Sequence, residues 1–153
     1  MSYDASIARL IKKFLDEDDW KYDFDANKGL FSFGLSLSNK LKKVSYRIRV
    51  RDDCYMVYAI SPLNADDCKA EMAEFITRAN YGLRNGNFEM DFDDGEIRYK
   101  SFVDFDGTVP GTQVIRDSIY VPASMFKRYG NGFVNILFGL KSPADAVAEC
   151  ETE

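Results

Sequence analysis

Four carboxylates crowd into residues 91–96, and oxygen ligands of this kind are what calcium prefers. An EF-hand loop needs acidic or amide ligands at positions 1, 3 and 5, glycine at position 6 and glutamate at position 12. Counting from Glu89 puts Asp94 where glycine belongs, and counting from Asp91 puts Gly95 at position 5. The spacing excludes an EF-hand loop, and Asp94-Gly95 between alternating runs predicts a β-hairpin instead.

The absence of histidine narrows the catalytic and metal-binding chemistry further. Without imidazole there is no Ser-His-Asp or Cys-His relay, no HExxH zinc site and no histidine general base. Cys54, Cys68 and Cys150 lie far apart without C-x-x-C spacing, so we expect no metal site, no disulfide framework and no cofactor. We therefore expect a protein that is not an enzyme. The alternative is a carboxylate-based enzyme, with or without a hard metal ion such as magnesium, or a small-ligand-binding protein.

Charge and hydropathy narrow the range of partners. The chain has 20 Lys and Arg against 25 Asp and Glu, a formal net charge of -5, and such a field repels phosphate backbones and argues against nucleic-acid binding. Charged residues interrupt every long apolar stretch, and none approaches the roughly 20 apolar residues that span a bilayer. The start, Met1-Ser2-Tyr3-Asp4, lacks the basic region of a signal peptide. We therefore expect a cytoplasmic protein with no membrane partner.

The candidate partner-binding residues alternate along a strand predicted near 44–50 and recur on the next strand. They are three arginines, a methionine and a tyrosine: Arg47, Arg49, Arg51, Met56 and Tyr58. An arginine can stack on the tyrosine ring and methionine adapts to varied apolar surfaces, so this face suits an acidic or amphipathic peptide. The alternative is a solvent-exposed face on which Asp23 and Asp25 balance the arginines. A peptide strand added to a sheet edge is another route, and the sequence does not identify an open edge.

Two periodicities divide the first half of the chain. Apolar residues at helical spacing predict an amphipathic helix over 4–17, followed by an acidic run that we interpret as a solvated turn. Over 20–61 the period switches to two, which predicts four antiparallel strands joined by short turns. Symmetric closure of these turns gives two apolar cross-strand rows: Tyr22, Phe33, Tyr46 and Ala59, and Phe24, Phe31, Ile48 and Val57. A one-residue slip would move a strand's apolar set to the opposite face, so the agreement supports this register.

The next segment predicts a helix and then the hairpin. The helix is capped within Asn64-Ala65-Asp66-Asp67 and ends by Gly82 or Asn85-Gly86. Its apolar face comprises Cys68, Met72, Phe75, Ile76 and Ala79. A two-residue hairpin turn at 94–95 pairs Phe92 with Ile97, Met90 with Tyr99, Asp91 with Arg98 and Glu89 with Lys100.

The C-terminal third predicts helices separated by breaks. Pro122 is expected to break or kink the helical segment or to begin a new helix. We favour a new helix that starts near Val121, because proline fits the first turn of a helix better than its interior. Gly130-Asn131-Gly132 predicts a helix break, and Ser142-Pro143 opens a short last helix to about Glu151. Together these elements predict a single α+β domain over 1–153. Its antiparallel sheet is a four-strand meander plus a β-hairpin, covered by N-terminal, central and C-terminal helices.

Several segments together resemble the YbjN-like family of bacterial proteins, described as sensory-transduction regulators with a fold like that of type III secretion chaperones. The likeness spans nearly the whole chain. It rests on the order and spacing of these residues: Trp20, Tyr22, Asn80, Gly86-Asn87-Phe88, Asp94-Gly95, Tyr129, Gly139, Pro143, Ala146 and Glu151. The resemblance implies a secretion-chaperone-like fold and a binding module without an assigned active site. We therefore expect a non-enzymatic, cytoplasmic protein-binding or regulatory module, chaperone- or adaptor-like, with a protein or peptide partner; a homodimer is left open.

Overall fold

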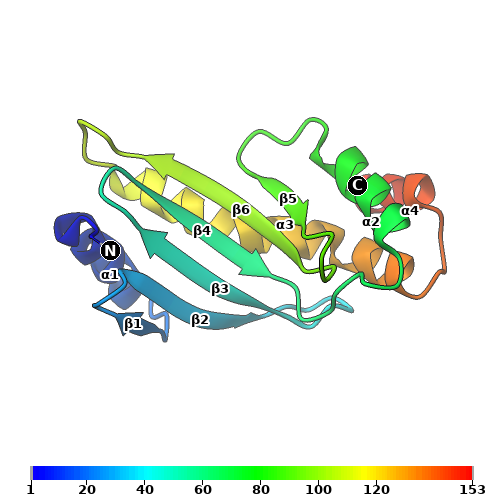
Figure 1. The fold of residues 1–153 in the computed structure, drawn as a ribbon, viewed down its shortest axis with the longest axis horizontal. Coiled ribbons are helices and arrows are strands. Elements are labelled where there is room, and N and C mark those ends of the chain that lie inside the picture. Colours follow the sequence, from blue (N-terminus) through cyan, green and yellow to red (C-terminus); the bar gives the residue numbers. More distant parts are fainter. Residues whose placement is uncertain (1, 153) are drawn as a thin grey trace.

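The computed structural model describes residues 2–152 as one antiparallel sheet with four helices (Figure 1). In chain order the elements are α1 (Ala5–Glu17), β1 (Asp23–Asp25), β2 (Leu30–Ser36), β3 (Lys43–Val50), β4 (Cys54–Ile60), α2 (Lys69–Asn80), β5 (Asn87–Met90), β6 (Ile97–Asp104), α3 (Thr112–Leu137) and α4 (Pro143–Glu151). This arrangement confirms the predicted α+β class. In the described part of the chain, no helix is long and apolar enough to cross a membrane.

The six strands lie in the order β1-β2-β3-β4-β6-β5, with every neighbouring pair antiparallel. The hairpin therefore joins the meander through its second strand, β6, which pairs with β4. The predicted row Phe24, Phe31, Ile48 and Val57 is confirmed, as is the pairing of Phe33, Tyr46 and Ala59. Tyr22, predicted beside Phe33 in that row, lies before the start of β1 and outside the paired residues.

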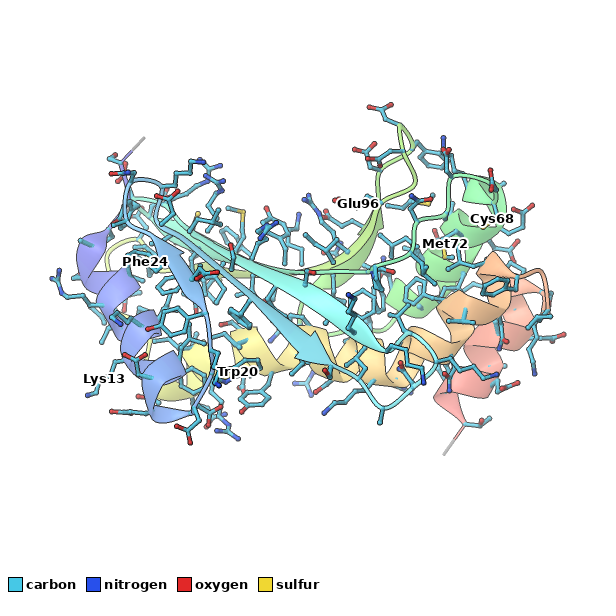
Figure 2. All side chains as sticks on the ribbon, turned by 90° about the horizontal axis from the view of Figure 1, so that it is seen from below. Lys13, Trp20, Phe24, Cys68, Met72 and Glu96 are labelled. Carbon is cyan, nitrogen blue, oxygen red and sulfur yellow. The ribbon has the colours of Figure 1, made fainter. Side chains whose placement is uncertain are left out.

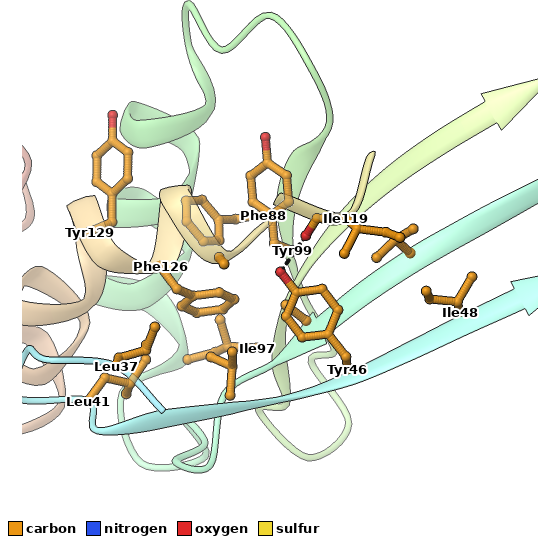
Figure 3. Close-up of a cluster of buried hydrophobic side chains, with 14 of the residues drawn as sticks. Leu37, Leu41, Tyr46, Ile48, Phe88, Ile97, Tyr99, Ile119, Phe126 and Tyr129 are labelled. Atoms are coloured by element: carbon orange, nitrogen blue, oxygen red, sulfur yellow. Dashed lines mark hydrogen bonds between the residues drawn. The ribbon is translucent and has the colours of Figure 1, made fainter. Parts of the chain in front are cut away.

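The helices cover one face of the sheet. Figure 2 shows α3 running along this side, with α1 near one end and α4 near the other. Alternate residues of β3 and β4 are buried beneath the helices, including Tyr46 and Tyr55. Figure 3 shows Tyr46 packed near Phe126 and donating a hydrogen bond to the carbonyl of Ile119, at 2.7 Å. Core packing and buried hydrogen bonds together therefore fix α3 on the sheet.

α3 is continuous through Pro122, so the prediction of a new helix near Val121 was wrong. Proline lacks the N–H that would bond the carbonyl four residues earlier, which is the carbonyl of Ser118. The buried hydroxyl of Ser101 on β6 donates to that carbonyl at 2.7 Å. The sheet thus supplies the donor that the helix lacks, and the helix continues.

The predicted break at Gly130-Asn131-Gly132 was also wrong, because these residues lie inside α3. The glycines mark places where other elements approach the helix closely. A Cβ atom at Gly132 would lie 2.6 Å from Cζ of Phe75 on α2 and 2.8 Å from Sγ of Cys150 on α4. Glycine is required here by packing and not by a helix end.

The β5–β6 hairpin has a wider loop than predicted. Met90 pairs with Ile97 and Phe88 with Tyr99, so the predicted pairs were wrong by two residues, although the residues that do pair share the predicted faces. Gly95, at φ 78°, accepts a hydrogen bond from the N–H of Ala65 at 2.8 Å. Because the loop is anchored on the segment before α2 in this way, it does not close as a two-residue turn, and Phe92 is left 60% exposed.

The predicted helix caps had mixed outcomes. Ser142 caps α4, with Pro143 in its first turn, as the sequence indicates. Asp4, expected as the first helical residue, is instead the N-cap of α1. The cap of α2 was placed too early, since this helix begins at Lys69 after Cys68. Asn64 instead accepts the N–H of Asp66 within a turn. Met72, Phe75, Ile76 and Ala79 are buried as predicted, and Cys68 is half-buried.

Candidate functional site

The face of the sheet opposite α3 brings four of the five candidate residues together. The β3–β4 register places Arg47 opposite Tyr58 and Arg49 opposite Met56. Both arginines alternate with buried residues of β3, so their side chains lie on the side away from the core. We call this surface the open face; it comprises Leu30, Ser32, Arg47, Arg49, Met56, Tyr58, Arg98, Lys100 and Phe102.

Arg51 lies outside this group of strand residues. β3 ends at Val50, and the N–H of Arg51 bonds the carbonyl of Cys54 at 2.8 Å in the β3–β4 turn. Its own carbonyl accepts the N–H of Asp4 at 3.1 Å. The backbone of Arg51 therefore ties the start of α1 to the sheet.

Arg47 and Arg49 have no acidic side chain within salt-bridge distance among residues 2–152. Asp23 lies two strands from Arg47 in the same cross-strand row, through Ser32. Asp25 lies 3.9 Å from the Nζ of Lys28 instead. The two arginines thus keep their charge free for a partner, and the proposed balance by Asp23 and Asp25 involves no direct contact.

A different arginine stacks on Tyr58. The guanidinium of Arg98, on β6, lies 4.3 Å from the centre of the Tyr58 ring, a cation–π distance. Arg98 and Lys100 both pair with Glu89, at 2.8 and 2.9 Å. Partial burial acts to raise the pKa of Glu89, but hydrogen bonds from Lys100 and Arg98 lower it below its usual value. Glu89 therefore stays ionised and offsets part of the positive charge at this end of the face.

Sequence reasoning missed the β6 part of the open face. Phe102 lies directly opposite Met56 and is 56% exposed, and Lys100 lies opposite Tyr58. Beside them is a hollow of about 740 Å³ lined by Arg84, Asn85, Gly86, Asn87, Lys100 and Phe102. The alternation within residues 98–102 indicated that Arg98, Lys100 and Phe102 share one face of their strand. Local spacing did not indicate which strand would pair with β6.

Side chains of the acidic run at the end of α1 accept hydrogen bonds from other residues of the protein. Asp16 accepts hydrogen bonds from Tyr22 and Lys12, which hold the pKa of its carboxyl low. Asp18 accepts from the Tyr120 hydroxyl and from the Trp20 indole, and these hydrogen bonds lower its pKa in that order of effect. Within residues 2–152, no group of three or more Cys, Asp or Glu side chains is arranged so that it could hold a metal ion.

The three thiols are not activated as nucleophiles. Burial is the largest cause that raises the pKa of Cys54, Cys68 and Cys150, which disfavours the reactive thiolate. The carboxylate-based enzyme or small-ligand binder does not depend on these thiols and stays a prediction.

No protein-family model matches the sequence, and no curated protein matches it significantly. The resemblance to the YbjN-like family stays a prediction. The site must be interpreted from its own residues.

Proposed function

We propose that the protein is a binding module that receives an acidic, amphipathic segment of a protein partner on its open face. The observation that carries the proposal is the pair Arg47 and Arg49, exposed or half-exposed without acidic partners, beside the half-exposed side chains of Met56 and Tyr58. Unpaired surface cations attract and orient an acidic ligand. Methionine and aromatic side chains adapt to apolar residues of varied shape.

We further propose that binding, and not catalysis, is the role of the protein, as a regulatory or adaptor-like module of the cytoplasm. The lack of histidine removes the commonest general base. The raised pKa of the three thiols argues against a cysteine nucleophile. The resemblance to the YbjN-like family implies the same kind of role.

The test is cross-linked affinity capture with three baits: the wild type, Arg47→Glu/Arg49→Glu, and Arg9→Glu/Lys13→Glu. The control pair lies four residues apart on exposed positions of α1 and gives the same change in net charge. We expect a partner that the wild type and the α1 variant both recover and the open-face variant loses. Equal recovery by all three baits would contradict the proposal.

The same variants distinguish a protein partner from a second copy of this chain. Sedimentation analysis of the wild type is expected to give a species whose mass does not change in Arg47→Glu/Arg49→Glu. A wild-type dimer that this variant dissociates would assign the open face to self-association and overturn the proposal of a separate partner.

A further inference from the structure

The outer edge of β6 is only partly covered by β5. The register pairs β5 with residues 97–100 of β6, and β5 begins at Asn87. β6 continues to Asp104, and Figure 1 shows no strand beside this last part. Residues 101–104 therefore form an edge that has a neighbour on the β4 side alone.

The direction of the backbone groups follows from hydrogen bonds at both ends of the β4–β6 ladder. The N–H of Ser61 donates to the carbonyl of Ile97, and the N–H of Phe105 donates to the carbonyl of Asp53. Odd-numbered residues of β6 therefore bond to β4, and even-numbered residues point their N–H and C=O groups away from it. Within residues 2–152 nothing bonds the outward backbone groups of Phe102 and Asp104.

The outer side of β5, the other strand at this end of the sheet, already has hydrogen-bond partners at Phe88. The side chain of Asn80, from α2, hydrogen-bonds the backbone of Phe88 on the outer side of β5. A peptide strand that approaches from this side thus finds free backbone groups on β6 and occupied ones on β5.

Each side of the free edge has a distinct chemical character. Toward the open face lies the hollow of about 740 Å³, with the cations Arg84 and Lys100 on its lining; Lys100 also pairs with Glu89, whereas Arg84 forms no salt bridge within residues 2–152. Toward the helices, Val103 is half-buried against the core. The carboxylate of Asp104 accepts the N–H of Asp106 and keeps its negative charge, so the acidic residues of an added strand are favoured beside Arg84 and Lys100 and not at the far end of the edge.

α3 adds apolar surface on the helix side. Tyr120 contacts Phe14 and Trp20, which marks the flank of α3 that faces α1. Helix geometry places Val114 and Val121 on the other flank, toward β6. Val114 is 46% exposed and Val121 is half-buried. A strand added at this edge would face cations on one side and valines on the other.

We propose that residues 101–104 of β6 bind an extended strand of a protein partner in which acidic and apolar residues alternate. Phe102 and Asp104 supply the backbone hydrogen bonds. Side chains of the added strand point to opposite faces, so acidic residues meet the side of Lys100 and Arg84 while apolar residues meet Val103 and Val114. The proposal rests on the proposed function for the acidic character of its ligand, and it extends the open face to the sheet edge.

The test is residue-resolved amide hydrogen exchange with the probe acetyl-(Val-Glu)4-amide, and acetyl-(Val-Lys)4-amide as the matched control. At saturation with Val-Glu, we expect exchange of the Phe102 and Asp104 amides to slow by about tenfold or more, because their N–H groups gain acceptors. The amides of Val103 and Phe105, bonded to β4 beforehand, are expected to change little. Three results would overturn the proposal: no slowing at Phe102 and Asp104, equal slowing by Val-Lys, or slowing instead at Gly34 and Ser36, which lie on β2 beyond its pairing with β1.

Two substitutions isolate the backbone donor. Phe102→Pro and Phe102→Thr both remove the ring, but proline alone removes the N–H, and that N–H lies outside the β4 ladder. We expect the Val-Glu probe to bind Phe102→Pro about fivefold more weakly than Phe102→Thr, which is the usual effect of one hydrogen bond. Equal affinities would overturn the proposal, and the exchange experiment on the wild type stands even where the proline variant fails to fold.

The proposal for the β6 edge and the proposal for the open face can fail independently of each other. If Arg47→Glu/Arg49→Glu retains its captured partner while Phe102 and Asp104 are protected by the probe, the open-face proposal fails and the edge proposal stands. If the open-face variant loses its partner while these amides stay unprotected, the edge proposal fails alone.

Discussion

The side chain of Asn80 makes hydrogen bonds to both backbone groups of Phe88: its Oδ1 lies 2.8 Å from the Phe88 nitrogen and its Nδ2 lies 2.9 Å from the Phe88 carbonyl oxygen. One amide thus takes the place of a neighbouring strand. It connects the last residue of α2 to the outermost strand of the sheet and keeps that edge from pairing with another chain.

Replacement of Asn80 by alanine is expected to lower the free energy of unfolding by about 1–3 kcal/mol, because the N–H of buried Phe88 loses its acceptor. Urea unfolding measures this loss. Asn87→Ala is the control: Asn87 also donates to the Phe88 carbonyl, at 3.1 Å, but Asn80 continues to satisfy that carbonyl. Equal losses in the two variants would contradict the role given to Asn80.

Ser101 and Pro122 are expected to be coupled in stability. Ser101→Ala leaves the buried carbonyl of Ser118 without a donor and is expected to cost about 1–3 kcal/mol in free energy of unfolding. In a Pro122→Ala background residue 122 regains its N–H, so the same substitution is expected to cost less. Urea unfolding of the four proteins of this double-mutant cycle measures the coupling. Independent, additive costs would show that Ser101 does not replace the missing helix donor.

Gly132→Ala is expected to destabilise the junction of α2, α3 and α4. The added methyl group would overlap Phe75 and Cys150, and overpacking of this kind usually costs about 1–3 kcal/mol. Gly34→Ala is the control, because a Cβ atom there meets only the carbonyl oxygen of Val44, at 4.0 Å. Thermal unfolding is expected to show a lower midpoint for Gly132→Ala alone; an unchanged midpoint would refute the packing role of this glycine.

Asp18 is expected to make stability depend on pH in the acidic range. Hydrogen bonds from Tyr120 and Trp20 hold its pKa below its usual value in the folded protein. Its contribution to stability is therefore full above the unfolded-state pKa, and it is lost as the pH falls through the lower folded-state pKa. The stability advantage of the wild type over Asp18→Asn should be constant between about pH 7 and 5 and shrink below about pH 4.

Urea unfolding at each pH, followed by the emission of Trp20, measures this advantage. The chain has one tryptophan, and its indole N–H donates to Asp18 at 2.8 Å, so the signal arises at the group in question. An advantage that grows on acidification would have the wrong sign and would refute the assignment.

The meander and the β3–β4 part of the open face were predictable because their signal is local. Alternation along each strand and short turns fixed the row Phe24, Phe31, Ile48 and Val57, and the same alternation placed Arg47 and Arg49 together. Short hairpins leave few alternative registers. That is why four of the five candidate residues lie where the sequence placed them.

The errors depend on contacts between segments distant in sequence. Pro122 is accommodated by a serine on β6, and Gly132 is explained by side chains of α2 and α4. The wide hairpin loop depends on the contact between Gly95 and Ala65. Phe102 belongs to the candidate site because β6 pairs with β4, a neighbour that no periodicity within β6 specifies.

The helical cover of the sheet is synthesised late. β4 ends at Ile60 and α3, which receives hydrogen bonds from Tyr46 and Tyr55, begins at Thr112, about 50 residues later. At roughly 5–20 residues per second the ribosome needs roughly 3–10 s for this stretch, whereas a hairpin closes in about 1–10 μs. Over that interval the nascent meander exposes the aromatic face that α3 later buries, and exposed apolar surface of this kind promotes aggregation of a growing chain.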